Sequence, residues 1–468
     1  MRREAKERLK TILIFLLIFS GVIQVGILWS YQKQGTPTDF LSALFRKTPR
    51  ISDEDVREAL FVPDRLVLSG GEMSHWIMPR GSVEYNRLWD EAMQGLAMIV
   101  SGKASLARTN EEWGDITEKM GYMIDFGYDV RPELLSWFLG TKVSSQDFPV
   151  ARKIMVRRDI IDESLATYYI RSNNGLVYVS GPIRNENAFR IRGTIEKLLG
   201  EENTGYRNYY TLGGSNIAEP MGAEPDVLYI SGAPKYWPYY EYTVRPPAKA
   251  SDEDELAEIL LGTDKDRYSR STGIDKIQFS FVNSFYEYHS NGYLSFNYLG
   301  TVDSSGEGGM VNALLNAYKF VAGIKGLLGP DVDIAIASIN ESKTRQGVYE
   351  IGFDYRIGGM PVMVDIDLKG GAAGKLSHAI SIQADRKRVL KCDALLKDFV
   401  QGQKSGYNDR FIDLLGQSGM GYKDMNVQDM YCGYYIDSPD AEVLEPALLV
   451  YLKDGSSITL DMMPEEGD

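Results

Sequence analysis

Histidine and cysteine, which often act as metal ligands, bases or nucleophiles, are rare in this chain of 468 residues. The three histidines, His75, His289 and His378, are far apart and show neither the H-x-x-H nor the Cys-His spacing of a zinc site. In a strand, His378 would lie on the same face as the apolar residues Leu376, Ile380 and Ile382. We therefore expect His378 to be a hydrogen-bonded core histidine rather than a ligand or a base.

The two cysteines, Cys392 and Cys432, are too few for a disulfide scaffold. They either pair with each other or stay as buried thiols. The sequence leaves both alternatives open.

Two glycine-containing stretches resemble functional loops, but each lacks an essential residue. Gly306 and Gly308 precede a predicted helix, yet Val311 stands where a dinucleotide-binding loop needs its last glycine. Residues 416–418 read Gly-Gln-Ser, but Met420 replaces the last glycine of a nucleophile elbow. We expect no cofactor and no activated serine from these patterns.

Acidic residues are plentiful but do not form a recognisable site. Asp264 and Asp266 begin like a calcium-binding loop, whose obligatory glycine is replaced by Ser269. Nothing marks a glycosidase pair, although the many carboxylates do not exclude one. We therefore expect no bound metal and no enzymatic activity.

An aromatic patch around Pro238 is the one other stretch with the composition of a binding site. Aromatic rings stack on sugar rings or on protein partners. Alternating aromatic residues are also typical of a half-buried strand, which is the interpretation we favour. The members of this patch are Tyr236, Trp237, Tyr239, Tyr240 and Tyr242.

Residues 11–31 carry no charge, and this stretch decides on which side of a membrane the rest of the chain is expected to lie. As a helix it would be about 31 Å long, enough to cross a hydrocarbon core of roughly 30 Å. Residues 1–10 carry a net charge of +3, which predicts a cytoplasmic N-terminus and export of everything after Tyr31. A cleaved signal peptide is the alternative, but no A-x-A-like cleavage site follows the apolar stretch.

Small and polar residues cluster near the middle of this predicted anchor. Helices in lipid pack through small residues and hydrogen-bonding side chains. We therefore expect Ser20, Gly21, Gln24 and Gly26 to contact a partner helix.

The net charge limits the classes of partner. The chain carries −14, so residues 11–468 carry −17. Such a chain repels nucleic acid and anionic lipid, which leaves proteins and neutral ligands as partners.

Hydrophobic periodicity predicts an α+β fold, a transmembrane helix followed by antiparallel sheets with helices packed on one face. The strongest signal is the alternation in residues 349–357 and 362–368 around Gly358 and Gly359. Helices are predicted over residues 84–100, 132–139, 309–324 and 393–400, with another capped by Ser251. The expected parts are a basic tail (1–10), the anchor (11–31), a linker (32–50) and three α+β domains (51–212, 213–328 and 329–468).

The order of these features resembles the YycH family of extracytoplasmic proteins. The resemblance rests on the basic N-terminus with its single anchor and on residues 85–96, 122–139, 285–324, 355–367 and 433–455. It implies a single-pass membrane protein that regulates the sensor histidine kinase WalK (YycG) and contacts its sister protein YycI. The glycine pair at 358–359 departs from the family pattern, in which Asn-Gly is commoner.

Three hypotheses about function follow. The first is a non-enzymatic, membrane-anchored regulator of a two-component system that controls cell-wall metabolism in Gram-positive bacteria. The second is an anchored module that binds wall glycan or peptide through the aromatic patch. The third is an anchored hydrolase of the envelope.

Overall fold

The computed structural model describes residues 51–71, 74–142, 148–159, 161–185, 188–200, 206–232, 234–301, 309–368 and 374–465. Residues from Val56 onward form one compact unit, which is the subject of the following description. The predicted anchor, residues 11–31, lies outside the described residues. No helix in the described part of the chain is both long and apolar enough to cross a membrane.

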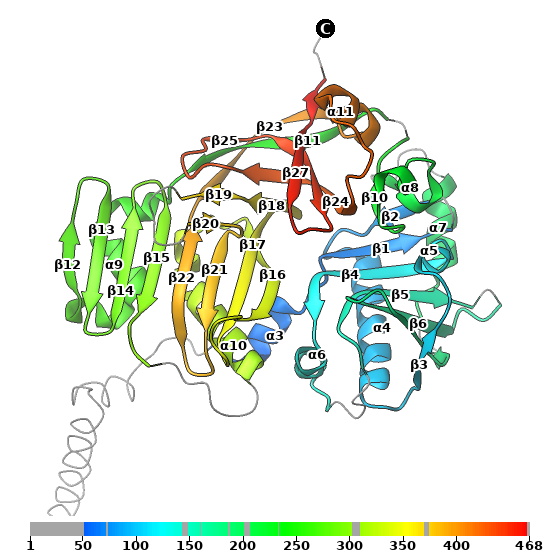
Figure 1. Ribbon diagram of the computed structural model, residues 1–468, viewed down its shortest axis with the longest axis horizontal. Helices are drawn as coiled ribbons and strands as arrows, with labels where there is room; N and C mark the ends of the chain where they lie inside the picture. Colours follow the sequence, from blue (N-terminus) through cyan, green and yellow to red (C-terminus); the bar gives the residue numbers. More distant parts are fainter. Residues whose placement is uncertain are drawn as a thin grey trace, which may run out of the picture. The chain divides into compact units, whose positions relative to one another are not determined.

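The first sheet is antiparallel and collects most strands before residue 230 (Figure 1). Its strand order is β10-β9-β2-β1-β4-β5-β6-β7-β3, and β8 pairs with β6. The strands are β1 (Arg65–Ser69), β2 (His75–Ile77), β3 (Leu106–Thr109), β4 (Gly121–Val130), β5 (Ala151–Arg158), β6 (Leu165–Ser172), β7 (Val177–Ser180), β8 (Ile183–Arg184), β9 (Asn208–Thr211) and β10 (Leu228–Tyr229).

The second large sheet runs from β12 to β27 in the order β12-β13-β14-β15-β22-β21-β17-β18-β24-β26-β27, with β16 paired to β17. All its pairs are antiparallel except β18 with β24, which is parallel. Its strands are β12 (Ser269–Thr272), β13 (Lys276–Phe281), β14 (Ser284–His289), β15 (Tyr293–Tyr298), β16 (Val332–Glu341), β17 (Tyr349–Ile357), β18 (Met360–Val364), β21 (Ile380–Ala384), β22 (Val389–Leu395), β24 (Val427–Ile436), β26 (Pro446–Leu452) and β27 (Ser457–Asp461).

Two smaller sheets complete the strands. One has the order β25-β11-β23-β28, and the other pairs β19 with β20. These strands are β11 (Tyr236–Arg245), β19 (Ile366–Asp367), β20 (Lys375–Leu376), β23 (Asp398–Asn408), β25 (Val443–Leu444) and β28 (Met463–Pro464).

Helices connect and cover the sheets. They are α3 (Asp53–Leu60), α4 (Val83–Val100), α5 (Trp113–Thr117), α6 (Pro132–Leu139), α7 (Ile191–Gly200), α8 (Ala218–Met221), α9 (Glu253–Leu261), α10 (Gly309–Ile324) and α11 (Phe411–Ser418). Short 3-10 turns occupy Leu212–Gly214, Ala248–Ser251, Gly262–Arg267 and Lys325–Leu327.

The first sheet is covered by helices on both faces near its centre, so the prediction that helices pack on one face only is wrong for this sheet. Helix α4 packs on the face that carries Tyr122 and Tyr168, since both hydroxyls donate hydrogen bonds to Glu91 of this helix. Helix α5 packs on the opposite face, where Met123 and Met155 join its core cluster. Strand β1 is therefore buried at every position, as in strands with two covered faces.

The strongest predicted hairpin is confirmed as far as Val364, whereas residues 366–367 of its predicted second strand form β19 and pair with β20 in another sheet. Strands β17 and β18 pair with Tyr355 opposite Val362, and both side chains are completely buried. Gly358 and Gly359 have φ of 58° and 81°, which a two-residue type I′ turn requires. The helices predicted over 84–100, 132–139 and 309–324 are also confirmed as α4, α6 and α10 within one residue.

Two local predictions are wrong. The helix expected over residues 393–400 is instead the end of β22 and the start of β23, because β22 is paired on both sides, with β15 and β21. Those tertiary pairings outweigh the weak local helix preference. Asp252 rather than Ser251 caps α9, since its carboxylate accepts hydrogen bonds from the backbone of Asp254 and Glu255.

The predicted boundaries at 212/213 and 328/329 remain a prediction. Strands β9 and β10 both lie in the first sheet, on either side of residue 212. Strands β15 and β22 pair with each other across residue 328.

Gly95 on α4 allows the helix to approach the sheet. A Cβ atom added to Gly95 would lie 2.0 Å from the hydroxyl oxygen of Tyr168, which is buried. We predict that Gly95→Ala lowers the free energy of unfolding by about 1–3 kcal/mol through overpacking, although alanine is the better helix former.

Gly193 on α7 is the matched control, because an added Cβ meets no atom within 4 Å there. Gly193→Ala should raise stability by up to about 1 kcal/mol. Urea unfolding of both variants measures the difference, and equal effects would contradict the packing argument.

Candidate functional site

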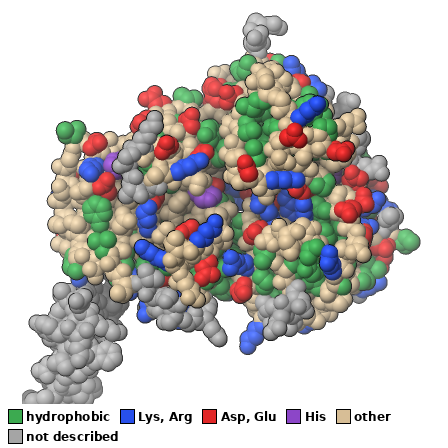
Figure 2. Space-filling view, viewed as in Figure 1, with side chains coloured by type: hydrophobic (Ala, Val, Ile, Leu, Met, Phe, Trp, Pro, Cys, Tyr) green, Lys and Arg blue, Asp and Glu red, His purple; other side chains and the backbone are tan. Residues whose placement is uncertain are grey.

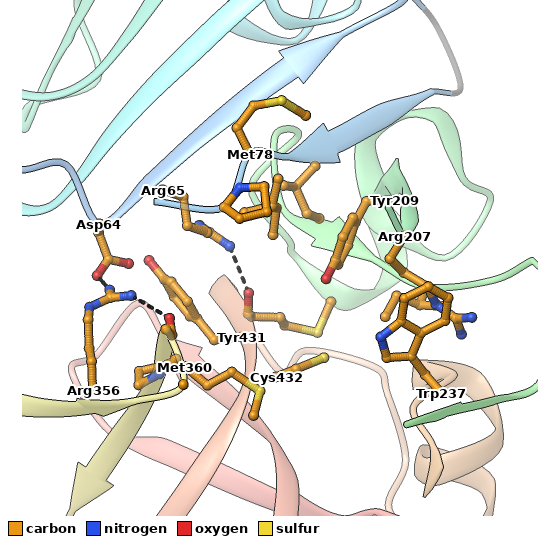
Figure 3. A pocket seen from close by; sticks show the side chains of 18 of the residues that line it. Asp64, Arg65, Met78, Arg207, Tyr209, Trp237, Arg356, Met360, Tyr431 and Cys432 are labelled. Carbon is orange, nitrogen blue, oxygen red and sulfur yellow. Dashed lines mark hydrogen bonds and ion pairs between the residues drawn. The ribbon is translucent and has the colours of Figure 1, made fainter. Parts of the chain in front are cut away.

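A cavity of about 480 Å³ lies where the first sheet meets β11, β18 and β24 (Figure 3). Its size falls within the range of about 300–1,000 Å³ typical of small-molecule sites. Its wall combines aromatic rings, methionines and arginines. The residues used below are Asp64, Arg65, Arg207, Tyr209, Trp237, Tyr239, Arg356, Tyr431 and Cys432.

Two arginines of this cavity lie over aromatic rings. The guanidinium carbon of Arg65 is 3.8 Å from the centre of the Tyr431 ring, and that of Arg207 is 4.9 Å from the centre of the Trp237 ring. Figure 3 shows both pairs at the cavity wall. Cation–π contacts of this kind fix the rings and leave their other faces able to stack on a ligand.

Acidic partners neutralise the arginines of the cavity. Arg65 contacts Asp125 and Asp429, each at 2.7 Å, while Arg207 pairs with Asp409 and Arg356 pairs with Asp64. The Nε–H groups of Arg65 and Arg207 have no hydrogen-bond partner among the described residues, although both side chains are over nine-tenths buried. The paired charges leave the cavity wall without strong net charge, which suits a neutral ligand.

Burial also sets the ionisation of the cavity. It raises the pKa of the Cys432 thiol to about 12 and raises the pKa of the Tyr239 hydroxyl. Burial raises the pKa of Asp409 too, outweighing the opposing effects of Arg207 and Tyr239. The thiol therefore stays protonated at neutral pH and is a poor nucleophile.

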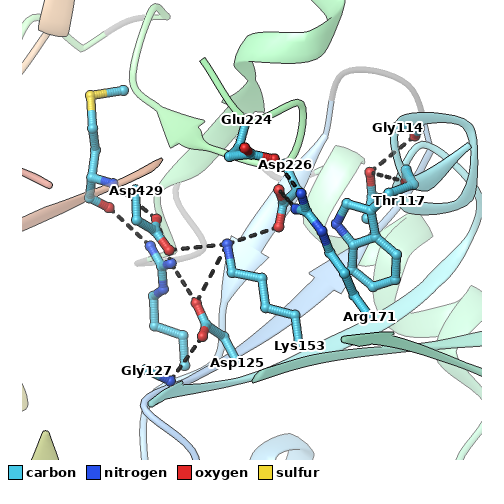
Figure 4. A network of polar contacts seen from close by, with 12 residues as sticks. Gly114, Thr117, Asp125, Gly127, Lys153, Arg171, Glu224, Asp226 and Asp429 are labelled. Carbon is cyan, nitrogen blue, oxygen red and sulfur yellow. Dashed lines mark hydrogen bonds and ion pairs between the residues drawn. The ribbon is translucent and has the colours of Figure 1, made fainter. Parts of the chain in front are cut away.

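Beside the cavity, four charged residues form a row across neighbouring strands of the first sheet, and Figure 4 labels three of them, Asp125, Lys153 and Arg171. We call Arg65, Asp125, Lys153 and Arg171 the charged row. They are direct register partners on β1, β4, β5 and β6. Register alone therefore aligns them on one face of the sheet.

Acidic residues from later segments face the charged row. Lys153 Nζ lies 2.8 Å from Asp226 and 3.0 Å from Asp429, and Arg171 lies 3.1 Å from Asp226. Burial opposes ionisation of both aspartates, but the nearby cations outweigh it and lower the pKa of Asp226 and of Asp429. The network therefore ties β1, β4, β5 and β6 to the segment before β10 and to β24 on the second large sheet.

The sequence did not indicate this network, because its members are far apart in the chain. One signal was present. Asp125 interrupts the apolar stretch of β4, and Lys153 directly precedes the buried apolar residues 154–156 of β5. Charges in such positions are costly to bury unless they are paired.

The residues of the predicted aromatic patch lie in different environments and do not form one surface. Trp237 and Tyr239 line the cavity. Tyr240 lies beneath the Lys404 ammonium and Tyr242 packs edge-on against Tyr434, because β11 shifts register between Tyr240 and Tyr242. Tyr236 lies beneath Lys235.

The other site residues predicted from the sequence, Ser20, Gly21, Gln24 and Gly26, lie outside the described residues. So do Gly306 and Gly308 of the glycine-rich loop. Among the residues that the structure describes, no three His, Cys, Asp or Glu side chains are grouped so that they could hold a metal ion. Cys392 and Cys432 are free thiols and do not pair with each other.

The three histidines have different surroundings. His75 is buried, and burial lowers its pKa to about 4. His289 contacts Glu287 at 2.8 Å. His378 is hydrogen-bonded at both ring nitrogens, as expected, but 26% of its side chain is exposed.

The prediction that His378 lies in the core is therefore wrong. It precedes β21 (Ile380–Ala384), so the strand alternation does not extend to it. Its Nε2 atom meets the hydroxyl of Ser338, a residue that the sequence did not single out.

Comparisons with known proteins identify the fold. No family model and no curated protein matches the chain. The crystal structure of YycH from Bacillus subtilis matches with a TM-score of 0.57 at 11% sequence identity, over 86% of this chain and 96% of that chain. An uncharacterized protein from Eubacterium rectale matches with a TM-score of 0.30 at 10% identity, over 53% of this chain and 94% of that chain.

Lys153 provides a test of the ionic network. Replacing it with methionine leaves Asp226 and Asp429 buried without their shared cation. We predict that Lys153→Met lowers the free energy of unfolding by about 3–5 kcal/mol.

Lys276→Met is the control, because the Lys276–Glu287 pair is 3.3 Å apart and the Lys276 side chain is 40% exposed. Its cost should stay within about 1 kcal/mol. Urea unfolding measures both variants. A Lys153→Met protein as stable as the control would show that the buried pairs do not stabilise the fold.

Proposed function

We propose that this chain, which has the fold of YycH, is a membrane-anchored regulator of a WalK-type sensor histidine kinase. The observation that carries the proposal is the fold match over 86% of the chain. It agrees with the independent resemblance to the YycH family in the order of anchor, strands and helices. In this proposal the N-terminus is cytoplasmic, residues 36–468 are extracytoplasmic, and a YycI-like protein is the second partner.

The regulatory contact is assigned to the predicted anchor. Gln24 lies about three residues past the centre of the charge-free stretch, where a side-chain amide has no water to bond. Interhelical hydrogen bonds in membranes contribute about 0.6 kcal/mol on average and up to about 1.7 kcal/mol. A bias of about 1.4 kcal/mol shifts a two-state equilibrium tenfold, so a bond near the upper end of this range can bias a kinase whose two states lie close in energy, although it cannot assemble a complex by itself.

The anchor substitutions test this mechanism. We predict that Gln24→Leu, and more strongly Gly21→Leu through steric exclusion, change expression of the kinase's target genes while export and abundance stay normal. Gly21 and Gln24 are three residues apart and so share one side of a helix.

Val22→Leu is the matched control, since Val22 lies about 200° away from Gln24 on an ideal helix. A reporter fused to a target promoter measures the effect. If all three variants, or a scrambled anchor of equal hydrophobicity, regulate normally, the anchor is only a tether and the extracytoplasmic domains carry the signal.

A second candidate function is an anchored module that binds neutral wall glycan or peptide. The observation in its favour is that Trp237 and Tyr239 of the aromatic patch line the 480 Å³ cavity. Aromatic faces with hydrogen-bond donors suit sugar rings.

Cosedimentation with purified cell walls separates the two functions. A regulator that works through protein contacts should leave residues 36–468 in the supernatant. Wild-type protein that sediments, with loss of sedimentation in Trp237→Ala but not in Trp137→Ala, would instead support the wall-binding module. Trp137 is a suitable control because it lies on α6, outside the cavity wall.

A further inference from the structure

Three polar side chains distant in sequence meet at a second site. They are Ser338 on β16, Asp354 on β17 and His378 in the turn before β21. Ser338 Oγ lies 3.0 Å from Nε2 of His378, and Nδ1 of His378 lies 3.2 Å from Oδ1 of Asp354. This order of serine, histidine and carboxylate is the one that activates the nucleophile of serine hydrolases.

The backbone holds the carboxylate in place. Asp354 Oδ1 accepts a hydrogen bond of 3.1 Å from the backbone N–H of Ala379, the residue after His378. An ionised Asp354 accepts the Nδ1–H of His378, which leaves Nε2 free to take the hydroxyl proton of Ser338. Asp354 thus favours the Nδ1–H tautomer of His378, in which Nε2 can act as a general base.

Gly352 provides the space for this contact. It is the register partner of Ser338. A Cβ atom at Gly352 would lie 2.3 Å from Cδ2 and 2.6 Å from Nε2 of His378, and 2.6 Å from Ser338 Oγ. Only glycine at this strand position lets the imidazole lie against the backbone and reach the hydroxyl.

The serine is placed at an irregular point of the sheet. The register between β16 and β17 shifts between Ile336 and Ser338, so Ala337 bulges out of the ladder. Bulges re-aim side chains and occur next to active sites.

A cavity of about 450 Å³ is lined by two of the three residues, His378 and Asp354, and by Ala337. Ser338 is half-buried and lies next to the lining residues Ala337 and His378. The other charged residues that line this cavity are Asp64, Arg152, Arg356, Asp365 and Lys375. Acidic and basic side chains are also interspersed over the face of the molecule shown in Figure 2. Because both signs of charge line the cavity, it suits a polar substrate rather than a long hydrocarbon chain.

We propose that Ser338 is an activated nucleophile that accepts acyl groups from polar carboxylic esters. This inference goes beyond the regulatory role and does not rest on it. It replaces the expectation, drawn from the sequence, that the chain has no enzymatic activity.

The reaction balances as an acyl transfer. Ser338 Oγ forms a bond to the ester carbonyl carbon as His378 Nε2 takes the hydroxyl proton. The tetrahedral intermediate collapses, the bond to the alcohol oxygen breaks, and the departing alkoxide receives the proton from His378. Water then attacks the acyl-serine by the same route and releases the acid.

The histidine environment fixes the direction of the pH dependence. Burial disfavours the imidazolium, but Asp354 outweighs this and raises the pKa of His378 above its ordinary value of 6.5. Acylation needs the neutral imidazole. The rate should therefore rise with pH as His378 loses its proton.

Labelling with a fluorophosphonate probe tests the nucleophile in the full-length protein in detergent. Ser338 Oγ should displace fluoride and give one phosphonylated peptide, identified by mass spectrometry. Ser338→Ala should abolish the adduct. Ser280→Ala should not, because the Ser280 hydroxyl is exposed and bonds only to Ser269 among the contacts described.

Gly352→Ala is a sharper test, because it retains Ser338, His378 and Asp354 but displaces the imidazole. It should lose labelling while circular dichroism shows the fold intact. A folded wild-type protein that stays unlabelled, or equal labelling of Ser338→Ala, would overturn the proposal.

The pH dependence of ester hydrolysis tests the positioning role of Asp354. Release of p-nitrophenol from p-nitrophenyl acetate is followed against pH. Asp354→Asn should lower the rate by roughly 10²-fold or more and move the rising limb of the profile to lower pH. A purely structural effect would lower the rate at every pH without moving the limb.

Discussion

The rest of the fold depends on how the charged row of the first sheet is neutralised. Arg65, Asp125 and Lys153 are adjacent by strand register and are withdrawn from water. Burying such charges costs several kcal/mol each unless partners satisfy them. The partners that complete the set, Asp226 and Asp429, arrive from segments more than 60 residues later in the chain. Any displacement of β24 that separates Asp429 from Arg65 and Lys153 would leave buried charges without these partners.

This constraint also shapes the cavity. Arg65 belongs to both features, since its guanidinium contacts Asp125 and Asp429 and lies over the Tyr431 ring at the cavity wall. The same pairing that fixes the two sheets thus keeps an arginine and an aromatic ring in a set position. A ligand in the cavity would contact a residue that joins the first sheet to β24, which is a physical route from binding to the arrangement of the sheets.

The site around Ser338 obeys a different constraint. It depends on the close approach of the His378 imidazole to the backbone of Gly352 rather than on paired charges, because the imidazole occupies the space that a side chain at position 352 would fill. It is also independent of the predicted anchor, on which the regulatory proposal depends. The two proposals can therefore succeed or fail separately, and a regulator can carry a reactive serine without using it for signalling.

Local features of the sequence determined much of the secondary structure. Alternation around Gly358 and Gly359 predicted the β17–β18 hairpin, because a two-residue turn with positive φ favours glycine. Pro132 predicted the start of α6, where a missing N–H costs nothing. The charge-free stretch over residues 11–31 is likewise a property of the sequence alone.

Only the tertiary structure decided that residues 393–395 lie in a strand, that Lys153 contacts Asp429, and that Ser338 contacts His378. These outcomes depend on the pairing of strands that are distant in the sequence. The register of that pairing sets the neighbours of each side chain, and no local sequence pattern reveals it.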